Sequence, residues 1–326
     1  MRKRIAALLA ALLLAAAALP ACRGYERQSI SYYDLFDTYC SFTVYGISGK
    51  DFDGLAEDLH TLLRRFHELT DIYHEYDEPN AAAINRLAGQ EAVSVDPLLA
   101  DFLRWALGAG EKTGGLVNIC LGAVTSLWHE ARENALADPS SAELPSEEAL
   151  REASAHTAPS VLRIEGNEIY LCDPAARLDL GALAKGYAAR LAAEFLAGRG
   201  VTNYLLSLGG SIVAKGEPLG SGRNAFRIGI QDPSGEEGSY CEVLELRDRA
   251  VATSGDYQRY FELDGVRYHH LLDPATLRPS AQSFRSVSVV CEDPAEADLL
   301  STALFLLNET EGRHLAEAFG AAVYYH

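Results

Sequence analysis

Five polar segments in the second half of the chain constrain this sequence most, because their order and combination are informative although no single segment is. In chain order they are LDLGALAKGYA (178–188), SLGGS (207–211), ATSGDYQRY (252–260), RYHHLLDPAT (267–276) and ADLLST (297–302). Together they supply carboxylates, hydroxyls, backbone-exposing glycines and a histidine. This combination fits a dinucleotide pyrophosphate that is held through a hard metal ion.

Hydrophobic periodicity predicts an α+β chain without internal repeats, with its strands concentrated in the second half. A helix is expected from Leu55 to Leu69, and Asp96-Pro97 is typical of a helix start. Residues 136–160 are polar and predict an exposed excursion that contains a short helix from Ser146. Further helices are expected at 184–197 and 294–307. Strands are expected at 40–46, 161–164, 168–172, 202–207, 226–231, 241–246, 259–263 and 284–291.

The segment that begins at Pro294 contains the strongest metal-binding signal. Asp298 and Thr302 are four residues apart, so on a helix their oxygens project from one face. Asp298 also lies in an otherwise apolar stretch, where an unpaired carboxylate would be costly. A metal ion would explain it, and so would an arginine partner. Mg²⁺ usually takes one or two protein carboxylates and leaves its other positions to water and phosphate.

Three glycine-containing segments predict turns that expose backbone groups. Asp179 precedes Gly181-Ala182 at a strand-to-helix turn, which directs a helix N-terminus at an anion. The segment 207–210 follows a strand and fits neither the G-x-G-x-x-G pattern nor the Walker pattern. It therefore predicts either a tight turn between strands or a ligand contact. Thr253-Ser254-Gly255 offers two hydroxyls and an amide in a further turn.

Two groups of histidines invite different interpretations. His60, His67 and His74 recur every seven residues. On a helix they would stand about 10 Å apart, beyond the reach of one tetrahedral metal, so a solvated helix face is expected. His269-His270 is different, because a neutral His270 could accept a proton from an attacking hydroxyl. We expect His269 to be a structural residue at a strand end.

The N-terminus predicts export. Residues 1–21 combine three basic residues with the uncharged run 5–18, which is typical of a signal peptide. The sequence Leu19-Pro20-Ala21-Cys22 resembles a lipobox, with Cys22 as the lipidated residue; ordinary cleavage after Ala21 is the alternative. A membrane-tethering segment is then expected over residues 22–32. With a formal net charge of −18, nucleic-acid binding is not expected. The other five cysteines are widely spaced, and most of them are expected to be small buried side chains.

As an ordered set, these segments resemble the ApbE family, the bacterial FAD:protein FMN transferases of flavin-trafficking lipoproteins. The resemblance covers most of the chain after the signal segment. In the first half it depends on Asp37-Thr38, Tyr76, Ile84-Asn85 and VNICLGAVTSLW (117–128). It implies one α+β domain over residues 33–326, with two lobes, mixed or antiparallel sheets, flanking helices and FAD bound between the lobes.

The resemblance also implies an activity. FMN is transferred from FAD to a Ser or Thr hydroxyl of an acceptor protein, with Mg²⁺ on the pyrophosphate and AMP as leaving group. The implied acceptor is a membrane redox protein that carries a segment similar to D/N-x-S/T-G-A-S/T. This chain has no such segment, so we expect it to be the donor enzyme.

Carried over residue by residue, the resemblance implies metal ligation by Asp298, Thr302 and the carbonyl of Ala182. His270 matches the histidine of flavin transfer; Asp273 either orients it or is only a turn residue. The remaining positions match the family's FAD contacts: Phe36, Tyr76, Leu116, Val117, Asn118, Asp179, Lys185, Gly209, Thr253, Ser254 and Gly255, together with His270 itself.

The chain departs from the family pattern at two positions. Phe36 stands where Met is frequent, and Leu277 replaces a common Gly. Neither change removes a metal ligand or the histidine. Two other functions stay open on the sequence: Mg²⁺-dependent hydrolysis of FAD to FMN and AMP, and flavin binding by a non-catalytic lipoprotein.

Overall fold

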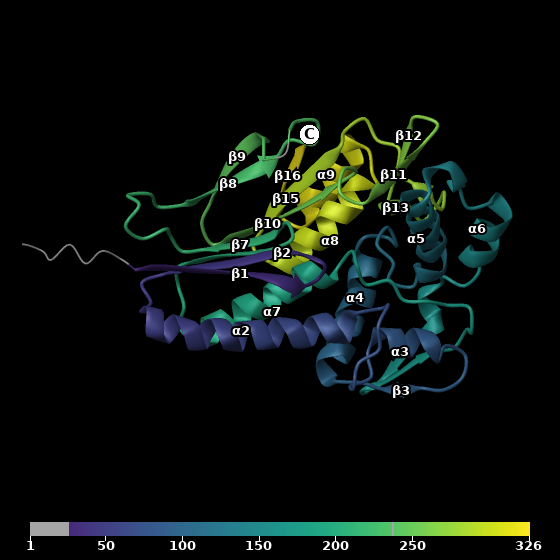
Figure 1. The fold of residues 1–326 in the computed structure, drawn as a ribbon, viewed down its shortest axis with the longest axis horizontal. Coiled ribbons are helices and arrows are strands. Elements are labelled where there is room, and N and C mark those ends of the chain that lie inside the picture. Colours follow the sequence, from purple (N-terminus) through teal and green to yellow (C-terminus); the bar gives the residue numbers. More distant parts are fainter. Residues whose placement is uncertain (1–25, 237) are drawn as a thin grey trace, which may run out of the picture.

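A computed structural model describes residues 26–236 and 238–326, so Cys22 and the predicted signal peptide lie outside the described residues. The body is built on one seven-stranded sheet in which every neighbouring pair is antiparallel (Figure 1). In order across the sheet, the strands are β1 (Arg27–Leu35), β2 (Thr38–Tyr45), β6 (Tyr204–Leu208), β7 (Ser211–Lys215), β10 (Arg249–Gly255), β15 (Ser286–Cys291) and β16 (Ala322–Tyr325).

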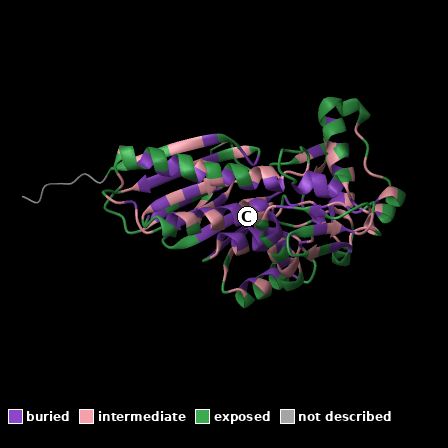
Figure 2. Cartoon of the chain, turned by 90° about the horizontal axis from the view of Figure 1, so that it is seen from below, coloured by how far each residue is buried: buried purple, intermediate pink, exposed green. Residues whose placement is uncertain are grey.

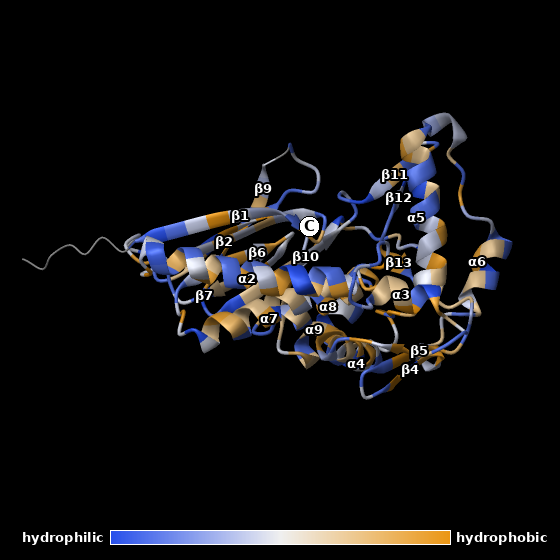
Figure 3. Cartoon of the chain, turned by 60° about the horizontal axis from the view of Figure 1, so that its bottom comes forward, coloured by the Kyte–Doolittle hydropathy of each residue, from blue (hydrophilic) through white to orange (hydrophobic). Residues whose placement is uncertain are grey.

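Helices cover one face of this sheet and a hairpin covers the other (Figure 1). Alternation along β10 shows the two faces, because Val251 packs with the hairpin whereas Ala250 and Ala252 belong to the helical core. The helices on the first face are α2 (Gly49–Thr70), α7 (Ala184–Gly198), α8 (Pro294–Phe305) and α9 (Glu309–Ala318). The hairpin on the other face is formed by β8 (Phe226–Gln231) and β9 (Tyr240–Leu246). Along α2, hydrophilic and hydrophobic residues alternate, as expected for a helix half in solvent (Figure 3).

A second lobe lies beyond one end of the sheet (Figure 1). Its centre is α5 (Gly122–Ala137), whose Trp128 packs in a separate core with Phe261 and Leu272. The end of α5 and the segment that follows it are exposed, as predicted for residues 136–160 (Figure 2). The helices of this lobe are α3 (Ala81–Arg86), α4 (Pro97–Lys112), α5 and α6 (Glu147–Ser154). Its strands are β3 (Val93–Ser94), β4 (Leu162–Glu165), β5 (Glu168–Leu171), β11 (Tyr260–Leu263), β12 (Val266–His269), β13 (Leu272–Asp273) and β14 (Arg278–Pro279).

Helix starts follow the predicted capping residues. Asp96 accepts a hydrogen bond from Leu98 N at the start of α4, and Ser146 accepts one from Ala149 N at the start of α6. Asp293 caps α8 in the same way and also forms an ion pair with Arg190 of α7. Because α7 and α8 carry site residues, this pair fixes the relative position of two walls of the site.

Most strands lie after residue 160, as predicted, and β2 corresponds to the strand expected at 40–46. Two other expectations about the fold need correction. Strand β1 begins at Arg27, so residues 27–32 are part of the folded body rather than of a tether. The segment 253–255 ends the central strand β10 and is not a turn. None of the helices formed by the described residues is long and apolar enough to span a bilayer.

Candidate functional site

A cavity of about 1520 Å³ lies where the sheet, α7, α8 and the second lobe meet. Small-molecule sites are usually about 300–1,000 Å³, so this cavity has room for an extended ligand and part of a second reactant. It brings together residues from all five polar segments and from the first half of the chain. The predicted site residues that line it are Phe36, Leu116, Val117, Asn118, Asp179, Ala182, Lys185, Gly209, Thr253, Ser254, Gly255, His270, Asp298 and Thr302.

Asp298 is the buried carboxylate of the site, with 6% of the residue exposed. Its Oδ2 accepts a 2.7 Å hydrogen bond from Gly186 N in the first turn of α7. Burial raises the pKa of the Asp298 carboxyl above its usual value, while Lys185, the Gly186 N–H and the Ser211 hydroxyl oppose part of that rise. The alternative explanation, an arginine partner, is not found: among the described residues Asp298 has no ion-pair partner. A buried carboxylate without a counter-ion suits a bound cation.

Hydroxyl groups from two elements meet beside Asp298. Ser254 Oγ of β10 lies 2.8 Å from Ser301 Oγ and 3.3 Å from Thr302 Oγ1 of α8. Thr253 also lines the cavity, but its Oγ1 lies 2.8 Å from Ser288 Oγ of β15 and not beside Asp298. Strand β10 therefore contributes the Ser254 hydroxyl to the site, although residues 253–255 do not form the predicted turn.

The donors in this corner fit a hard divalent cation. Asp298 and Thr302 lie one turn apart on α8, as predicted, and Ala182 lines the same cavity through the non-helical residues before α7. Among the described residues there is no group of three His, Cys, Asp or Glu side chains that could bind a metal. The site would therefore hold an ion through one carboxylate, a hydroxyl and a carbonyl, which is an oxygen-only set that suits Mg²⁺.

The turn that carries Asp179 is fixed from the second lobe. Asn85 of α3 donates a 3.1 Å hydrogen bond to Leu178 O and accepts a 2.6 Å bond from Leu178 N. Asp179 N donates to Ile119 O at 2.8 Å, and Asp179 Oδ1 accepts from Gly181 N at 3.0 Å. The predicted Asp179-Gly181 turn is therefore present, and hydrogen bonds from the second lobe hold it in place.

Two neighbouring hairpin turns form another wall. Phe36 and Asp37 connect β1 to β2 with φ values of 54° and 51°, a conformation that costs non-glycine residues about 1–2 kcal/mol each. Gly209 and Gly210 connect β6 to β7, so the predicted tight turn is confirmed. A Cβ on Gly209 would lie 2.4 Å from Thr38 Cγ2, which explains why glycine is needed at this wall.

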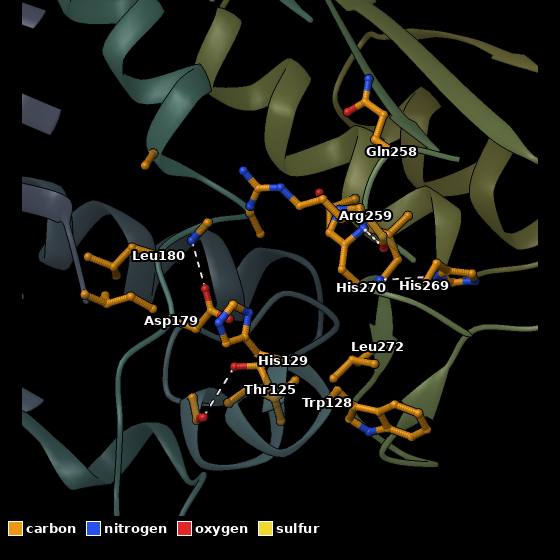
Figure 4. Close-up of a pocket in the computed structure, with 18 of the residues that line it drawn as sticks. Thr125, Trp128, His129, Asp179, Leu180, Gln258, Arg259, His269, His270 and Leu272 are labelled. Carbon is orange, nitrogen blue, oxygen red and sulfur yellow. Dashed lines mark hydrogen bonds between the residues drawn. The ribbon is translucent and has the colours of Figure 1, made fainter. Parts of the chain in front are cut away.

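His270 opens onto the cavity from the end of the β11–β12 hairpin. Its Nδ1 lies 3.3 Å from Arg259 O, and its backbone N donates to the same carbonyl at 3.1 Å. A proton on Nδ1 would make that contact a hydrogen bond and leave the Nε2 lone pair free to accept a proton. Surrounding protein lowers the pKa of His270 below its usual value, and the charges of Arg259 and Lys185 lower it further. Figure 4 shows His270 and Arg259 across the cavity from Asp179 and Leu180.

His269 is the structural residue of the pair, as predicted. It is buried, its Nε2 donates to Ser280 O at 2.9 Å and its Nδ1 accepts from Leu271 N at 3.2 Å. Asp273 does not hold His270, which corrects its proposed orienting role. Its carboxylate instead accepts from Ala275 N at 2.8 Å, so it is a turn residue and does not line the cavity.

Tyr76 also stands outside the cavity lining. Its hydroxyl donates to Asp71 Oδ2 at 3.1 Å, and Asp71 itself faces the cavity. The three regularly spaced histidines have separate partners, and His74 lies beyond the end of α2 at Thr70, so they do not share one helix face. His60 pairs with Asp34, His67 Nδ1 accepts from Phe36 N, and His74 pairs with Asp71. They do not form a purely solvated face, because His60 and His67 are partly buried.

Several lining residues were not predicted. Tyr73 packs on His129 with ring centroids 5.2 Å apart, and Arg259 and Ser211 also face the cavity. On α5 the lining residues recur at helical spacing, and this spacing could have shown that one face of a helix enters the site: Gly122, Thr125, Ser126, Trp128, His129, Arg132, Ala135 and Leu136. Leu277 adopts a φ of 60°, so the common glycine it replaces stands at a left-handed position.

Comparison with known proteins agrees with the predicted resemblance. Residues 36–325 match the family model described as "ApbE family". A Treponema pallidum protein named FAD:protein FMN transferase is 33% identical, over 91% of this chain and 82% of its own length. One of the same name from Vibrio cholerae is 32% identical, over 98% and 91%. Among solved structures, the flavin transferase ApbE from Vibrio cholerae superposes with a TM-score of 0.78 at 29% identity, covering 92% of this chain and 93% of that one. The ApbE protein from Thermotoga maritima gives 0.77 at 28% identity, with 92% and 94% covered.

Proposed function

This chain belongs to the ApbE family, and we propose that it transfers FMN from FAD to a Ser or Thr hydroxyl of an acceptor redox protein and releases AMP. We further propose that the reaction depends on Mg²⁺. The relatives named FAD:protein FMN transferase support the flavin-transfer part. The observation that carries the proposal is one cavity that contains both a buried carboxylate without a counter-ion, Asp298, and a neutral histidine, His270.

The residues around Asp298 would hold the pyrophosphate end of FAD. Asp298, Thr302 and the Ala182 carbonyl would hold Mg²⁺, which supplies charge neutralisation on the phosphate oxygens and favours the AMP leaving group. Lys185 lines the same cavity and adds a positive charge. Phosphoryl-type transfer needs positioning and charge neutralisation more than covalent chemistry. These groups would supply both at the pyrophosphate.

His270 would act as the general base. With Nδ1 held at the Arg259 carbonyl, Nε2 can accept the proton of the acceptor hydroxyl while that oxygen bonds to the FMN phosphorus. The bond between that phosphorus and the bridging oxygen breaks, and AMP takes the electron pair. The lowered pKa of His270 keeps the ring neutral, with the Nε2 lone pair available, at neutral pH, and it also makes the ring a weaker base than an ordinary histidine.

The same residues could also activate water, which would make the protein an FAD pyrophosphatase. The relatives named FAD:protein FMN transferase favour a protein hydroxyl over water as the second reactant. A flavin carrier without activity needs neither a general base nor a cation site. We therefore place protein flavinylation first.

We also propose export and lipid anchoring through Cys22, on the strength of the signal features of the N-terminal segment. The acceptor would then be a membrane redox protein on the same side of the membrane as this chain. Globomycin, which blocks lipoprotein signal cleavage, tests the anchor: the precursor should accumulate. Unchanged processing would contradict lipidation.

The reaction is tested by following AMP and FMN from FAD and Mg²⁺, with and without a peptide that carries the acceptor segment. Peptide-dependent AMP with FMN bound covalently to the peptide supports the transferase. AMP and free FMN in equal amounts, regardless of peptide, would make the protein a pyrophosphatase. FAD binding without any AMP would leave the flavin-carrier function.

A further inference from the structure

Ser211 is a buried polar residue that the reaction above leaves without a role. Only 2% of the residue is exposed, and its Oγ has no hydrogen-bond partner. An orphaned buried hydroxyl costs about 1–3 kcal/mol, so its presence needs an explanation such as an ion or water in the functional state. Among the described residues, the only other side-chain hydroxyls in this condition are Ser286 Oγ and Tyr325 OH, and neither residue lines the cavity.

The position of Ser211 in the fold connects it to Asp298. It is the first residue of β7, directly after the Gly209-Gly210 turn, and it lines the cavity. Strand β7 contacts both α7, which carries Gly186, and α8, which carries Asp298. The Ser211 hydroxyl is also among the groups that favour the ionised form of Asp298, although it lies outside hydrogen-bond geometry.

We propose that Ser211 is a positioning residue for the cation site: its hydroxyl donates to Asp298 when a divalent cation is bound, and so orients the carboxylate. Gly186 N already holds Oδ2, so Ser211 would supply the second fixed contact. The inference rests on the proposed function, because it assumes a cation at Asp298. Removing a hydrogen-bond partner of a metal-ligating carboxylate typically weakens metal affinity about 10–100-fold.

The test is Mn²⁺ binding to the full-length protein, followed by the electron paramagnetic resonance signal of the free ion. Ser211→Ala should raise the Kd for Mn²⁺ about 10–100-fold, and Ser211→Thr, which keeps a hydroxyl, should restore most of the affinity. Ser286→Ala is the matched control, since it removes an equally buried and unpartnered hydroxyl away from the cavity, and its Kd should equal that of the wild type.

Thermal unfolding without metal separates this role from a structural one. Because Ser211 Oγ has no partner to lose, Ser211→Ala should melt at the wild-type temperature or above it. A Kd for Ser211→Ala equal to the wild-type value would overturn the inference, and so would a fall in melting temperature without rescue by Thr. Failure of the wild type to bind Mn²⁺ would overturn the inference and the proposed metal dependence together. Wild-type binding that Asp298→Ala abolishes and Ser211→Ala leaves intact would overturn the inference alone.

Discussion

The backbone N–H of Gly186 donates a 2.7 Å hydrogen bond to Oδ2 of Asp298 and thereby caps α7 from another helix. Helix N-termini leave four N–H groups without partners inside the helix, and the residue before α7, Leu183, offers no side-chain cap. Asp298 takes the place of that cap. The Asp298 carboxylate therefore caps the N-terminus of α7 and also faces the cavity. This double role couples the packing of α7 against α8 to the proposed cation site.

This relationship predicts that Gly186→Ala is harmful. A Cβ at residue 186 would lie 2.3 Å from Asp298 Cβ and 2.8 Å from Pro294 O. Overpacking of this kind costs about 1–3 kcal/mol of unfolding free energy, and the displaced carboxylate should also bind Mg²⁺ more weakly. Urea unfolding and a Mg²⁺ titration measure the two effects. Gly198→Ala in the same helix is the control, because nothing lies within 4 Å of its added methyl.

Asp298→Asn should make the melting temperature of the protein independent of Mg²⁺. The pKa of Asp298 is raised, so between its unfolded value near 3.8 and its folded value the native state binds more protons than the unfolded state. Wild-type stability without metal should therefore fall as pH rises through that window, and Asp298→Asn should lack this dependence. We expect Mg²⁺ to raise the melting temperature of the wild type but not of the variant. An equal Mg²⁺ response in both proteins would contradict the assignment of Asp298 as a ligand.

His270→Ala should abolish transfer and leave FAD binding intact. Because its pKa is lowered, His270 stays neutral well below pH 6.5, so the acidic limb of kcat should lie at lower pH than for an ordinary histidine. Quenching of flavin fluorescence measures binding, and AMP release measures turnover over the pH range. Asp273→Asn, which keeps the turn acceptor, is the control and should retain turnover. Full activity of His270→Ala would remove this histidine from the mechanism.

The turn at Gly209 offers a fourth prediction with an internal control. Gly209 and Gly210 both have positive φ, at 56° and 101°, but only Gly209 has a neighbour in the way, Thr38 Cγ2 at 2.4 Å. Alanine at either position carries backbone strain of about 1–2 kcal/mol. Gly209→Ala should cost more than Gly210→Ala in urea unfolding and should also weaken FAD binding, because Thr38 and Gly209 both line the cavity. Equal losses in the two variants would exclude the proposed contact.

Local signals were enough to predict much of the site. Asp298 and Thr302 could be assigned to one helix face from their spacing, and Asp293-Pro294 marked where that helix begins. The Gly209-Gly210 turn and the structural role of His269 also followed from local patterns. These features depend on residues that are close in sequence, which is why periodicity and turn chemistry reach them.

Features that depend on contacts between residues far apart in the chain could not be predicted from the sequence. The Asp298–Gly186 and Asn85–Leu178 bonds join residues far apart in the chain, and the sequence does not say which helix will need a cap from elsewhere. Residues 253–255 suggested a turn because of their hydroxyls and glycine, but pairing with β15 makes them the end of strand β10. The spacing along α5 could have indicated a helix with one face in the site, but not that its apolar residues pack on Phe261 and Leu272 from a distant part of the chain.

Covalent attachment of FMN to a protein acceptor is the central claim, and intact mass spectrometry measures it directly. An acceptor redox protein would be incubated with FAD, Mg²⁺ and either the wild-type chain, His270→Ala or Asp298→Ala. The account predicts an acceptor heavier by one FMN unit with the wild type, only the unmodified mass with His270→Ala, and modification that needs far more Mg²⁺ with Asp298→Ala. An unmodified acceptor with the wild type, or the same modified mass at the same Mg²⁺ concentration with all three proteins, would contradict it.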